Sequence, residues 1–440
     1  MDILIITTFY PPDTAVAAVR PYMMAKYLTE RGHNVTVLRS GEFFNSASDY
    51  FDMNIPVRVI SYLGPDSPAE QYARGELKEV PVVEGNSRIS FLPELIRKPV
   101  AWAFNTCMRP IRFKQAQEAI AEKVKKQMAA LDGLRDAHFD VVFTTFGQQE
   151  NIAAGQYAAK LFGCKLIQDY RDPLARRVFQ TRGEYRTLKK IQDDSIRKAD
   201  GLTTVSEGFR REMMKGLDVQ TPNITIYNGY EPVAQEQPVE MVEPGVFSFC
   251  YTGILYGEHS DFAPLLQALQ KLSAEGHIDL SRVKINYAGK DFDQLRELAQ
   301  KLNMTDILNN HGYVSRGEAA RLQQISDIFL VLSWNRHDSQ GVMPGKFYEG
   351  IRAKKPILSI VSGNLPDSEL CYLNEKYHYG FCYEASRDAA HFDDFCDFLA
   401  KSYEEKMKFG RVRHEISPEL EDRFRYDNLA KQLEDFILSI

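Results

Sequence analysis

The sequence predicts an α/β protein of two doubly wound domains, each a parallel sheet with helices on both faces. Three observations lead to this fold class. The 440 residues are 44% apolar and 26% charged, which is enough apolar material for the cores of two or three domains. Strand-like apolar runs alternate with amphipathic helical stretches from Ile3 onward. The alternation stops once, at the proline-rich stretch 231–245, and then restarts, so this stretch is the expected linker.

The first half, residues 1–230, opens with a βαβ pattern. A strand at Ile3–Thr7 precedes a helical stretch closed by Gly32, and a second strand follows at Asn34–Leu38. Further strands are expected at 57–62, 140–145, 165–168, 201–205 and 224–227, and helices at 149–162, 184–198 and 207–216. An insertion at about 64–135 interrupts the rhythm. Strand–helix–strand units of this kind build a parallel sheet.

The second half repeats the pattern over 246–405. Strands are expected at 246–252, 283–288, 328–333 and 356–361, and helices at 261–275, 291–302, 315–325 and 345–353. One long helical tail is expected from about Ala389 to the C-terminus. Its last part, within 406–440, carries an apolar face that we expect to dock back on the first domain, formed by Leu429, Leu433, Phe436 and Ile437. Two such domains are expected to face a central ligand cleft.

Composition excludes several classes of protein. A net charge of −6 with high apolar content argues against disorder, and six dispersed cysteines without a CxxC pair are typical of a reducing compartment. No basic run precedes the apolar N-terminus, and no stretch approaches 18 apolar residues, so we expect a cytoplasmic protein. Residues 1–230 hold 31 Lys and Arg against 27 Asp and Glu, whereas 231–440 hold 23 against 33.

The loop after the first strand, 10–21, is a candidate for lining the active site. It lies where a doubly wound fold presents helix amides to an anion, and Arg20 is available to a phosphate or carboxylate. The alternative is a plain strand-to-helix connection. Because the loop lacks GxGxxG, a Rossmann dehydrogenase is disfavoured.

A mixed-charge turn follows the strand at 165–168. Asp169, Arg171 and Asp172 stand at the carboxyl end of that strand, where α/β enzymes place their chemistry, and we predict them as catalytic residues. The alternative is an internal Asp–Arg pair that pins the loop.

A glycine-bearing loop and a helix beginning near Gly345 follow the strand at 328–333. The free N–H groups and partial positive charge of a helix N-terminus suit a diphosphate, and Lys346 adds a cation. Glu349 lies one turn further on, where its carboxylate can accept both hydroxyls of a ribose. The alternative is a first-turn Glu that satisfies the helix dipole beside a solvated Lys.

The motif Met343-Pro-Gly-Lys-Phe-Tyr-Glu349, followed by Ala353-Lys-Lys-Pro-Ile-Leu358, resembles the donor-binding signature of family 4 glycosyltransferases, which have the two-Rossmann-domain GT-B fold. Other segments resemble that family in the same order; they are 1–21, 169–173, 199–206, 227–230, 251–256 and the C-terminal helix. The resemblance spans nearly the whole chain except about 62–135.

The resemblance also suggests donor-site residues and two departures. It adds Gly253, His259, Gly341 and Pro344 to Arg20, Gly345, Lys346 and Glu349 as donor- or phosphate-binding residues. The family pairs two Glu with seven residues between them, and here Gly341 occupies the first position. A basic pair often follows the first strand of the second domain, but here Ile254 replaces the Arg and His259 stands near the Lys position.

The resemblance implies a hexosyl or other glycosyl transferase that retains configuration, needs no metal and has no cofactor besides its nucleotide-sugar substrate. By family habit the donor is a UDP-sugar rather than a GDP-sugar. The acceptor is a glycan or lipid-linked molecule, and the role is surface polysaccharide biosynthesis. Two alternatives remain open: a sugar-nucleotide epimerase of the same architecture, and a non-catalytic partner subunit that lost the acid at position 341.

The segment 91–126 is rich in cations and aromatic residues. From 95 to 117 it holds Arg97, Lys98, Arg109, Arg112 and Lys114 and no acid. This pattern suits a helix on anionic lipid at the inner face of a membrane, and the alternative is an ordinary amphipathic helix with a solvated basic face. No nucleic-acid recognition motif accompanies it, so nucleic acid is not an expected partner.

Overall fold

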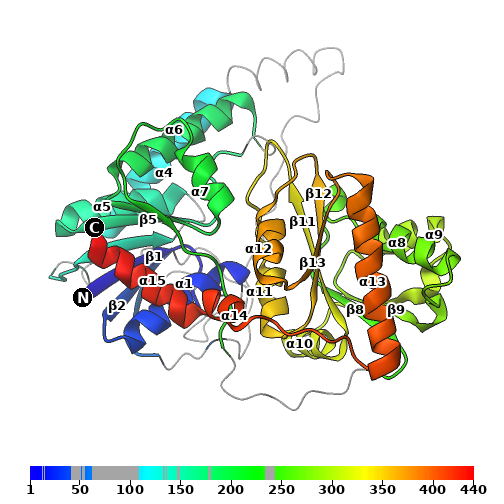
Figure 1. Cartoon of the computed structure of the whole chain (residues 1–440). Helices are drawn as coiled ribbons and strands as arrows, with labels where there is room; N and C mark the ends of the chain where they lie inside the picture. Colours follow the sequence, from blue (N-terminus) through cyan, green and yellow to red (C-terminus); the bar gives the residue numbers. More distant parts are fainter. Residues whose placement is uncertain are drawn as a thin grey trace, which may run out of the picture. The chain divides into compact units, whose positions relative to one another are not determined.

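The structure is a computed structural model of the chain. It describes residues 1–40 except 12 and 14, and residues 51, 55–61, 109–131, 134, 136–145, 149–176, 180–232 and 243–440. The chain divides into two compact units, each with its own parallel sheet (Figure 1). Unit 1 comprises 1–205, 209–227 and 429–440, and unit 2 comprises 206–208 and 228–428.

Unit 1 contains a parallel sheet with the strand order β3-β2-β1-β4-β5-β6-β7. Its strands are β1 (Asp2–Thr7), β2 (Asn34–Arg39), β3 (Arg58–Ser61), β4 (Val141–Thr145), β5 (Lys165–Tyr170), β6 (Gly201–Thr204) and β7 (Asn223–Thr225). Its helices are α1 (Val16–Glu30), α4 (Arg109–Ala129), α5 (Gln149–Phe162), α6 (Arg182–Lys198), most of α7 (Glu207–Met214) and most of α15 (Tyr426–Ser439). The strand order reverses between β1 and β4.

Successive side chains of the central strands point to opposite faces of the sheet, and nearly all of them are buried, so both faces are covered. Leu4, Ile6, Val142 and Leu166 pack with α4 and α5 in one apolar core. The apolar face predicted for the C-terminal helix is buried, and a Cβ on Gly201 would lie 2.9 Å from the ring of Phe436. The last turns of α15 therefore pack on the sheet of unit 1.

Unit 2 contains a parallel sheet with the strand order β10-β9-β8-β11-β12-β13. Its strands are β8 (Phe247–Thr252), β9 (Val283–Ala288), β10 (Leu308–Gly312), β11 (Ile328–Asn335), β12 (Ile357–Gly363) and β13 (Gly380–Glu384). Its α-helices are α8 (Ala263–Ala274), α9 (Phe292–Lys301), α10 (Arg316–Ile325), α11 (Gly345–Arg352), α12 (Glu369–Tyr377), α13 (Ala389–Phe409) and α14 (Pro418–Arg423). Short 3-10 helices are η3 (Gly257–His259), η4 (Leu280–Arg282) and η5 (Thr305–Ile307).

The helices of unit 2 cover both faces of its sheet. Phe247, Phe249 and Ile285 face α8 and α13 (orange in Figure 1) in an extensive apolar core. On the opposite face, Leu322 of α10 packs against Cys250 of β8. The fold class predicted from the sequence, two parallel-sheet α/β domains, is confirmed.

The predicted elements differ from the observed ones mainly in the second half. The sequence analysis omitted β10, β13 and α12, which are short and carry mixed polar residues. The expected single helix from Ala389 to the C-terminus is wrong. Helix α13 ends because Gly410 adopts a φ of 73°, and α14 begins separately with Ser417 as its N-cap and Pro418 in its first turn.

Two predicted features lie wholly or mainly outside the described residues. Of the linker 231–245, only 231, 232 and 243–245 are described. Of the basic segment 91–126, the structure describes only the part that begins α4, so the membrane-facing role of Arg97 and Lys98 stays a prediction.

Candidate functional site

The carboxyl edge of the unit 2 sheet gathers most of the residues predicted to bind a donor. Strand order reverses between β8 and β11, and in open α/β sheets ligands bind beyond the carboxyl ends of the strands at such a point. Gly253 directly follows β8, and the loop 336–344 connects β11 to α11. The fold therefore places both sequence motifs at the reversal point of one sheet.

An ion pair within α11 is the centre of this site. Lys346 Nζ donates to Glu349 Oε1 and Oε2 over 2.9 and 2.8 Å, and the two side chains are 27% and 33% exposed. The spacing of three residues puts both side chains on one helix face. Both groups therefore lie together, partly exposed, on α11, and their predicted roles in donor binding stay predictions.

Two residues that the sequence analysis missed, Gln323 and Thr252, fix the position of the Glu349 carboxylate. Gln323 Nε2 on α10 donates to Glu349 Oε2 over 2.8 Å and to Thr252 Oγ1 over 2.9 Å. Gln323 and Thr252 are only 2% and 3% exposed. A buried amide anchored at the end of β8 therefore fixes one carboxylate oxygen. No local sequence signal identifies Gln323 and Thr252 as partners of Glu349. The three residues come from separate segments of the chain, and only the order of the strands in the folded sheet brings them together.

The N-terminus of α11 is suited to an anion. Its N-cap is Pro344, no side chain caps the helix, and its first turn holds no acid. A Cβ added to Gly345 would meet no atom within 4 Å, so the start of the helix is open. The backbone N–H groups of Gly345 and Lys346 are thus available to a negatively charged ligand, whereas that of Phe347 donates to the Pro344 carbonyl oxygen over 3.0 Å.

Gly253 gives the ammonium of Lys346 room. Its φ is 150°, and a Cβ there would lie 3.1 Å from Lys346 Cε. The backbone of Gly289 lies closer still to Gly253, since a Cβ on Gly289 would lie 2.1 Å from the carbonyl oxygen of Gly253. A larger residue at position 253 would displace the cation.

His259 lies at the same edge, within an aromatic cluster. Its ring centroid is 5.0 Å from that of Trp334 near the end of β11, and the ring centroid of Tyr256 is 6.0 Å from that of Trp334. The His259 carbonyl oxygen accepts a weak hydrogen bond from Ser362 Oγ of β12. His259 Nδ1 is buried and makes no hydrogen bond with any described residue.

Gly341 adopts a left-handed backbone with φ of 70°. The loop around it is held by Trp334 Nε1, which donates to Ser339 Oγ over 2.9 Å, and by Ser333 Oγ, which donates to the Val342 carbonyl oxygen. A glutamate at position 341 would occupy an unfavourable conformation. The backbone of this loop therefore favours the glycine found at position 341 over the glutamate expected from the resemblance.

In unit 1, Arg20 and Asp169 form a buried ion pair. Arg20 Nε and Nη2 donate to Asp169 Oδ2 and Oδ1 over 2.8 and 2.7 Å, and the side chains are 1% and 0% exposed. Thr203 Oγ1 donates to Asp169 Oδ1, and Arg20 Nη1 donates to the Tyr227 carbonyl oxygen. This geometry matches the alternative of an internal pair that pins the strand end, and neither side chain is exposed to a ligand here.

The other two predicted catalytic residues point elsewhere. Arg171 Nη1 donates to the Ala17 carbonyl oxygen over 2.5 Å. Asp172 is 56% exposed and pairs with Arg176 over 2.7 Å. The structure therefore does not bring Asp169, Arg171 and Asp172 into one cluster, and the catalytic role of each stays a prediction. Of the two carboxylates, Asp169 is buried and Asp172 is exposed.

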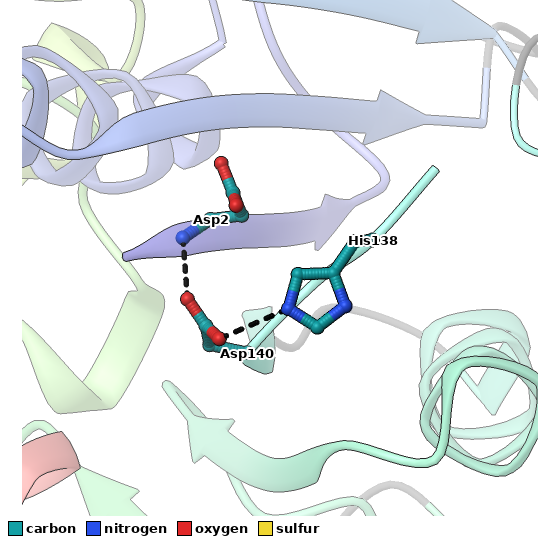
Figure 2. A group of neighbouring side chains, drawn as sticks. All are labelled: Asp2, His138 and Asp140. Atoms are coloured by element: carbon teal, nitrogen blue, oxygen red, sulfur yellow. Dashed lines mark hydrogen bonds and ion pairs between the residues drawn. The ribbon is translucent and has the colours of Figure 1, made fainter. Parts of the chain in front are cut away.

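One group among the described residues has the composition of a metal site. Asp2, His138 and Asp140 offer ligand atoms within 4.8 Å of one another, at the amino-terminal edge of the unit 1 sheet. Asp140 already accepts from the Asp2 amide over 2.7 Å and contacts His138 Nε2 over 3.2 Å. Figure 2 shows the Asp2 carboxylate pointing away from the other two side chains. These hydrogen bonds account for the arrangement of the three residues.

None of the helices that the structure describes combines the length and the apolar character of a membrane-spanning segment.

Comparison with known proteins identifies the fold. No protein-family model and no curated protein sequence matches the chain. Anabaena HepE, solved in complex with UDP and glucose, is 14% identical with a TM-score of 0.57, and the match covers 100% of both chains. Sucrose-phosphate synthase from Thermosynechococcus elongatus is 12% identical with a TM-score of 0.58, and the match covers 100% of this chain and 98% of that one.

A third similar structure is the apo form of the lipopolysaccharide outer core galactosyltransferase WaaB. It is 13% identical with a TM-score of 0.56, and the match covers 100% of this chain and 99% of the other. At such identities the likeness establishes the fold alone. Together with the two parallel sheets, it shows that this chain has the GT-B fold of glycosyltransferases.

Proposed function

We propose that this protein is a glycosyltransferase that takes its sugar from a nucleotide donor bound at the carboxyl edge of the unit 2 sheet. The observation that carries the proposal is the arrangement of Lys346 and Glu349 on α11, beside an uncapped helix N-terminus and at the reversal point of the sheet. The N–H groups at Gly345 and the ammonium of Lys346 would hold the diphosphate. Glu349 would accept hydrogen bonds from the two ribose hydroxyls.

We propose a UDP-sugar as the donor. The similar Anabaena protein was solved with UDP and glucose and with UDP-glucose, which supports a uridine nucleotide here. His259, whose Nδ1 has no partner among the described residues, would contribute a hydrogen bond to the diphosphate or the sugar.

The reaction we propose breaks the bond between the anomeric carbon and the diphosphate oxygen and forms a bond from that carbon to an acceptor hydroxyl. The acceptor proton passes to the departing phosphate, and the configuration is retained. The chain's part is to stabilise the charge that develops on the diphosphate, which amides and a cation at a fixed helix end can do without reorganising. In this proposal no metal is required, and Asp172, the exposed acid of its turn, assists on the acceptor side.

We further propose a glycan or lipid-linked acceptor in surface polysaccharide biosynthesis, with contact between 91–126 and anionic lipid. Cosedimentation with anionic vesicles tests this contact. Pelleting should be lost when Arg97, Lys98, Arg109 and Arg112 are changed to Glu, and equal pelleting of the two proteins would reject it.

The experiment that tests the proposed activity has two parts. A panel of UDP, GDP and ADP is screened for a rise in melting temperature, and UDP should give the largest shift. UDP-sugars are then incubated with and without glycan acceptors, and the release of UDP and the anomeric configuration of the product are measured.

Each outcome has a distinct meaning. Acceptor-dependent UDP release with a retained anomer supports the proposal, whereas formation of the epimeric sugar nucleotide without acceptor would show an epimerase. A protein that no nucleotide stabilises would be a non-catalytic partner. Glu297→Ala, an exposed Glu on α9, serves as a matched control for Glu349→Ala.

A further inference from the structure

Unit 2 contains a cavity at the edge of its sheet opposite the candidate donor site. Its volume is about 660 Å³, and its lining includes Ser248, Lys284, Asn286, Leu308, His311 and Arg321, together with Glu243, where the described chain resumes. Ser248 and Lys284 are the second residues of β8 and β9, and Leu308 is the first residue of β10. The cavity therefore belongs to the amino-terminal edge of the sheet, opposite the edge that carries Gly253 and α11.

The ionisable side chains that line the cavity are mainly basic. They are Lys284, His311, Arg321 and Glu243. The basic character of the lining differs from the net charge of this half of the chain, since residues 231–440 hold 33 Asp and Glu and only 23 Lys and Arg. Leu322 and Ile325 of α10 supply the apolar part of the lining. Basic groups over an apolar floor suit a small ligand that carries negative charge.

The basic groups are held in place by their own contacts. Lys284 Nζ donates to the Asp306 carbonyl oxygen over 2.8 Å, which uses one of the three N–H donors of the ammonium. Arg321 donates from Nε and Nη2 to Glu318 over 2.9 and 2.8 Å, which fixes the plane of the guanidinium. Both cations are thus positioned before any ligand arrives, which lowers the entropy cost of binding, and a ligand would share Arg321 with the Glu318 carboxylate.

The side chains of Asn286, Asn309 and His311 in the lining are hydrogen-bonded to one another. Asn286 Oδ1 accepts from Asn309 Nδ2 and from His311 Nε2, each over 3.0 Å. Since a carbonyl oxygen only accepts, His311 Nε2 must carry a proton, and its Nδ1 is the ring atom left to interact with other groups. Burial lowers the pKa of His311, while Glu318 raises it and Arg321 lowers it.

We propose that this cavity binds a small metabolite through a doubly charged oxyanion, a phosphate ester or a dicarboxylate, held between Lys284 and Arg321. The site is separate from the donor site and does not depend on the chain's being a glycosyltransferase. The two sources of the anion differ in geometry, because a phosphate presents three oxygens on one centre and a dicarboxylate presents two separated planar groups.

The test is isothermal titration calorimetry of the full-length protein with inorganic phosphate and with succinate. All titrations are repeated in a Lys346→Ala background, which removes the cation of the donor site. Binding of one of the two anions should survive in that background. It should weaken at least about fivefold in Lys284→Met and in Arg321→Gln, as expected for loss of a charge-assisted hydrogen bond.

Further variants separate charge from folding. Glu243→Gln should bind the anion more tightly, since it removes the negative charge at the cavity, and Lys284→Arg should retain binding. Lys301→Met, an exposed lysine on α9, should bind like the parent. Melting curves show whether each variant is folded.

Phosphate binding without succinate binding would identify a phosphoryl ligand, and the reverse a dicarboxylate. The proposal is overturned if neither anion binds, if binding disappears in the Lys346→Ala background, or if folded Lys284→Met and Arg321→Gln bind as the parent does.

Discussion

Gln323 donates a hydrogen bond to Glu349 over 2.8 Å while a second one ties it to Thr252, so α10 positions the carboxylate that α11 presents. Gln323 is buried, whereas Glu349 is a third exposed. The buried amide holds Oε2, which Lys346 also contacts, and leaves Oε1 to accept from Lys346 or from a ligand.

Changing Gln323 to Leu should weaken UDP binding about three- to tenfold, because Glu349 loses a neutral donor that costs about 1 kcal/mol to remove. Gln323→Glu should weaken it further, since two carboxylates would then face each other. Titration calorimetry measures both affinities. If Gln323→Leu is folded and binds UDP like the parent, Gln323 does not position Glu349.

The buried pair of Arg20 and Asp169 predicts a stability effect. Arg20→Met leaves the Asp169 carboxylate buried without its cation and should cost about 3–5 kcal/mol in the free energy of unfolding of unit 1. The double variant Arg20→Met/Asp169→Leu should recover part of this loss. Urea denaturation followed by circular dichroism gives the values. A loss below about 1 kcal/mol for Arg20→Met would contradict a structural role for the pair.

The left-handed backbone of Gly341 predicts that a side chain there is destabilising. Gly341→Ala should lower the free energy of unfolding of unit 2 by about 1–2 kcal/mol, because φ is 70°. Gly345→Ala is the matched control, since Gly345 begins a helix with open space around its Cβ, and it should be neutral or slightly stabilising. Equal melting temperatures for Gly341→Ala and the parent would show that the loop is not constrained at this residue.

His391 predicts a dependence of stability on pH. Burial lowers the pKa of His391, as does Arg387, and its Nε2 accepts a hydrogen bond from the Glu384 amide over 3.1 Å. Since the folded state favours the neutral ring, this stabilisation is fully present above a pH of about 6.5 and is lost as the pH falls through the lowered pKa.

Calorimetric melting temperatures between pH 5 and 8 test this point. His391→Phe keeps the stacking on Phe381 and Tyr383 but removes the titrating group, so its melting temperature should fall less on acidification. The half-buried His311 and His414 add a dependence of the same sign, which stays in the variant. An identical pH profile for parent and variant would contradict the role of His391.

The sequence predicted the architecture because strand and helix periods are local properties. The runs at 283–288 and 328–333 are apolar enough to be recognised, whereas β10, with Asn309, Asn310 and His311, is not. The break at Gly410 was missed because a single glycine within a helical pattern does not show whether its backbone becomes left-handed.

The candidate site could be predicted only where it lies within one segment. Gly345, Lys346 and Glu349 are neighbours on one helix, so their spacing was informative. Gln323 and Glu349 lie on different helices and come together only in the folded unit, and Arg20 is 149 residues away from Asp169 in the sequence. Such contacts depend on which strands become neighbours, and no local pattern encodes that.

The affinity of UDP for Glu349→Ala, measured by titration calorimetry beside the parent and the control Glu297→Ala, tests the central claim most directly. Loss of an acceptor for the ribose hydroxyls should weaken UDP binding at least about tenfold in Glu349→Ala and leave Glu297→Ala unchanged. If all three folded proteins bind UDP with the same affinity, α11 does not hold the nucleotide and the proposed donor site is wrong.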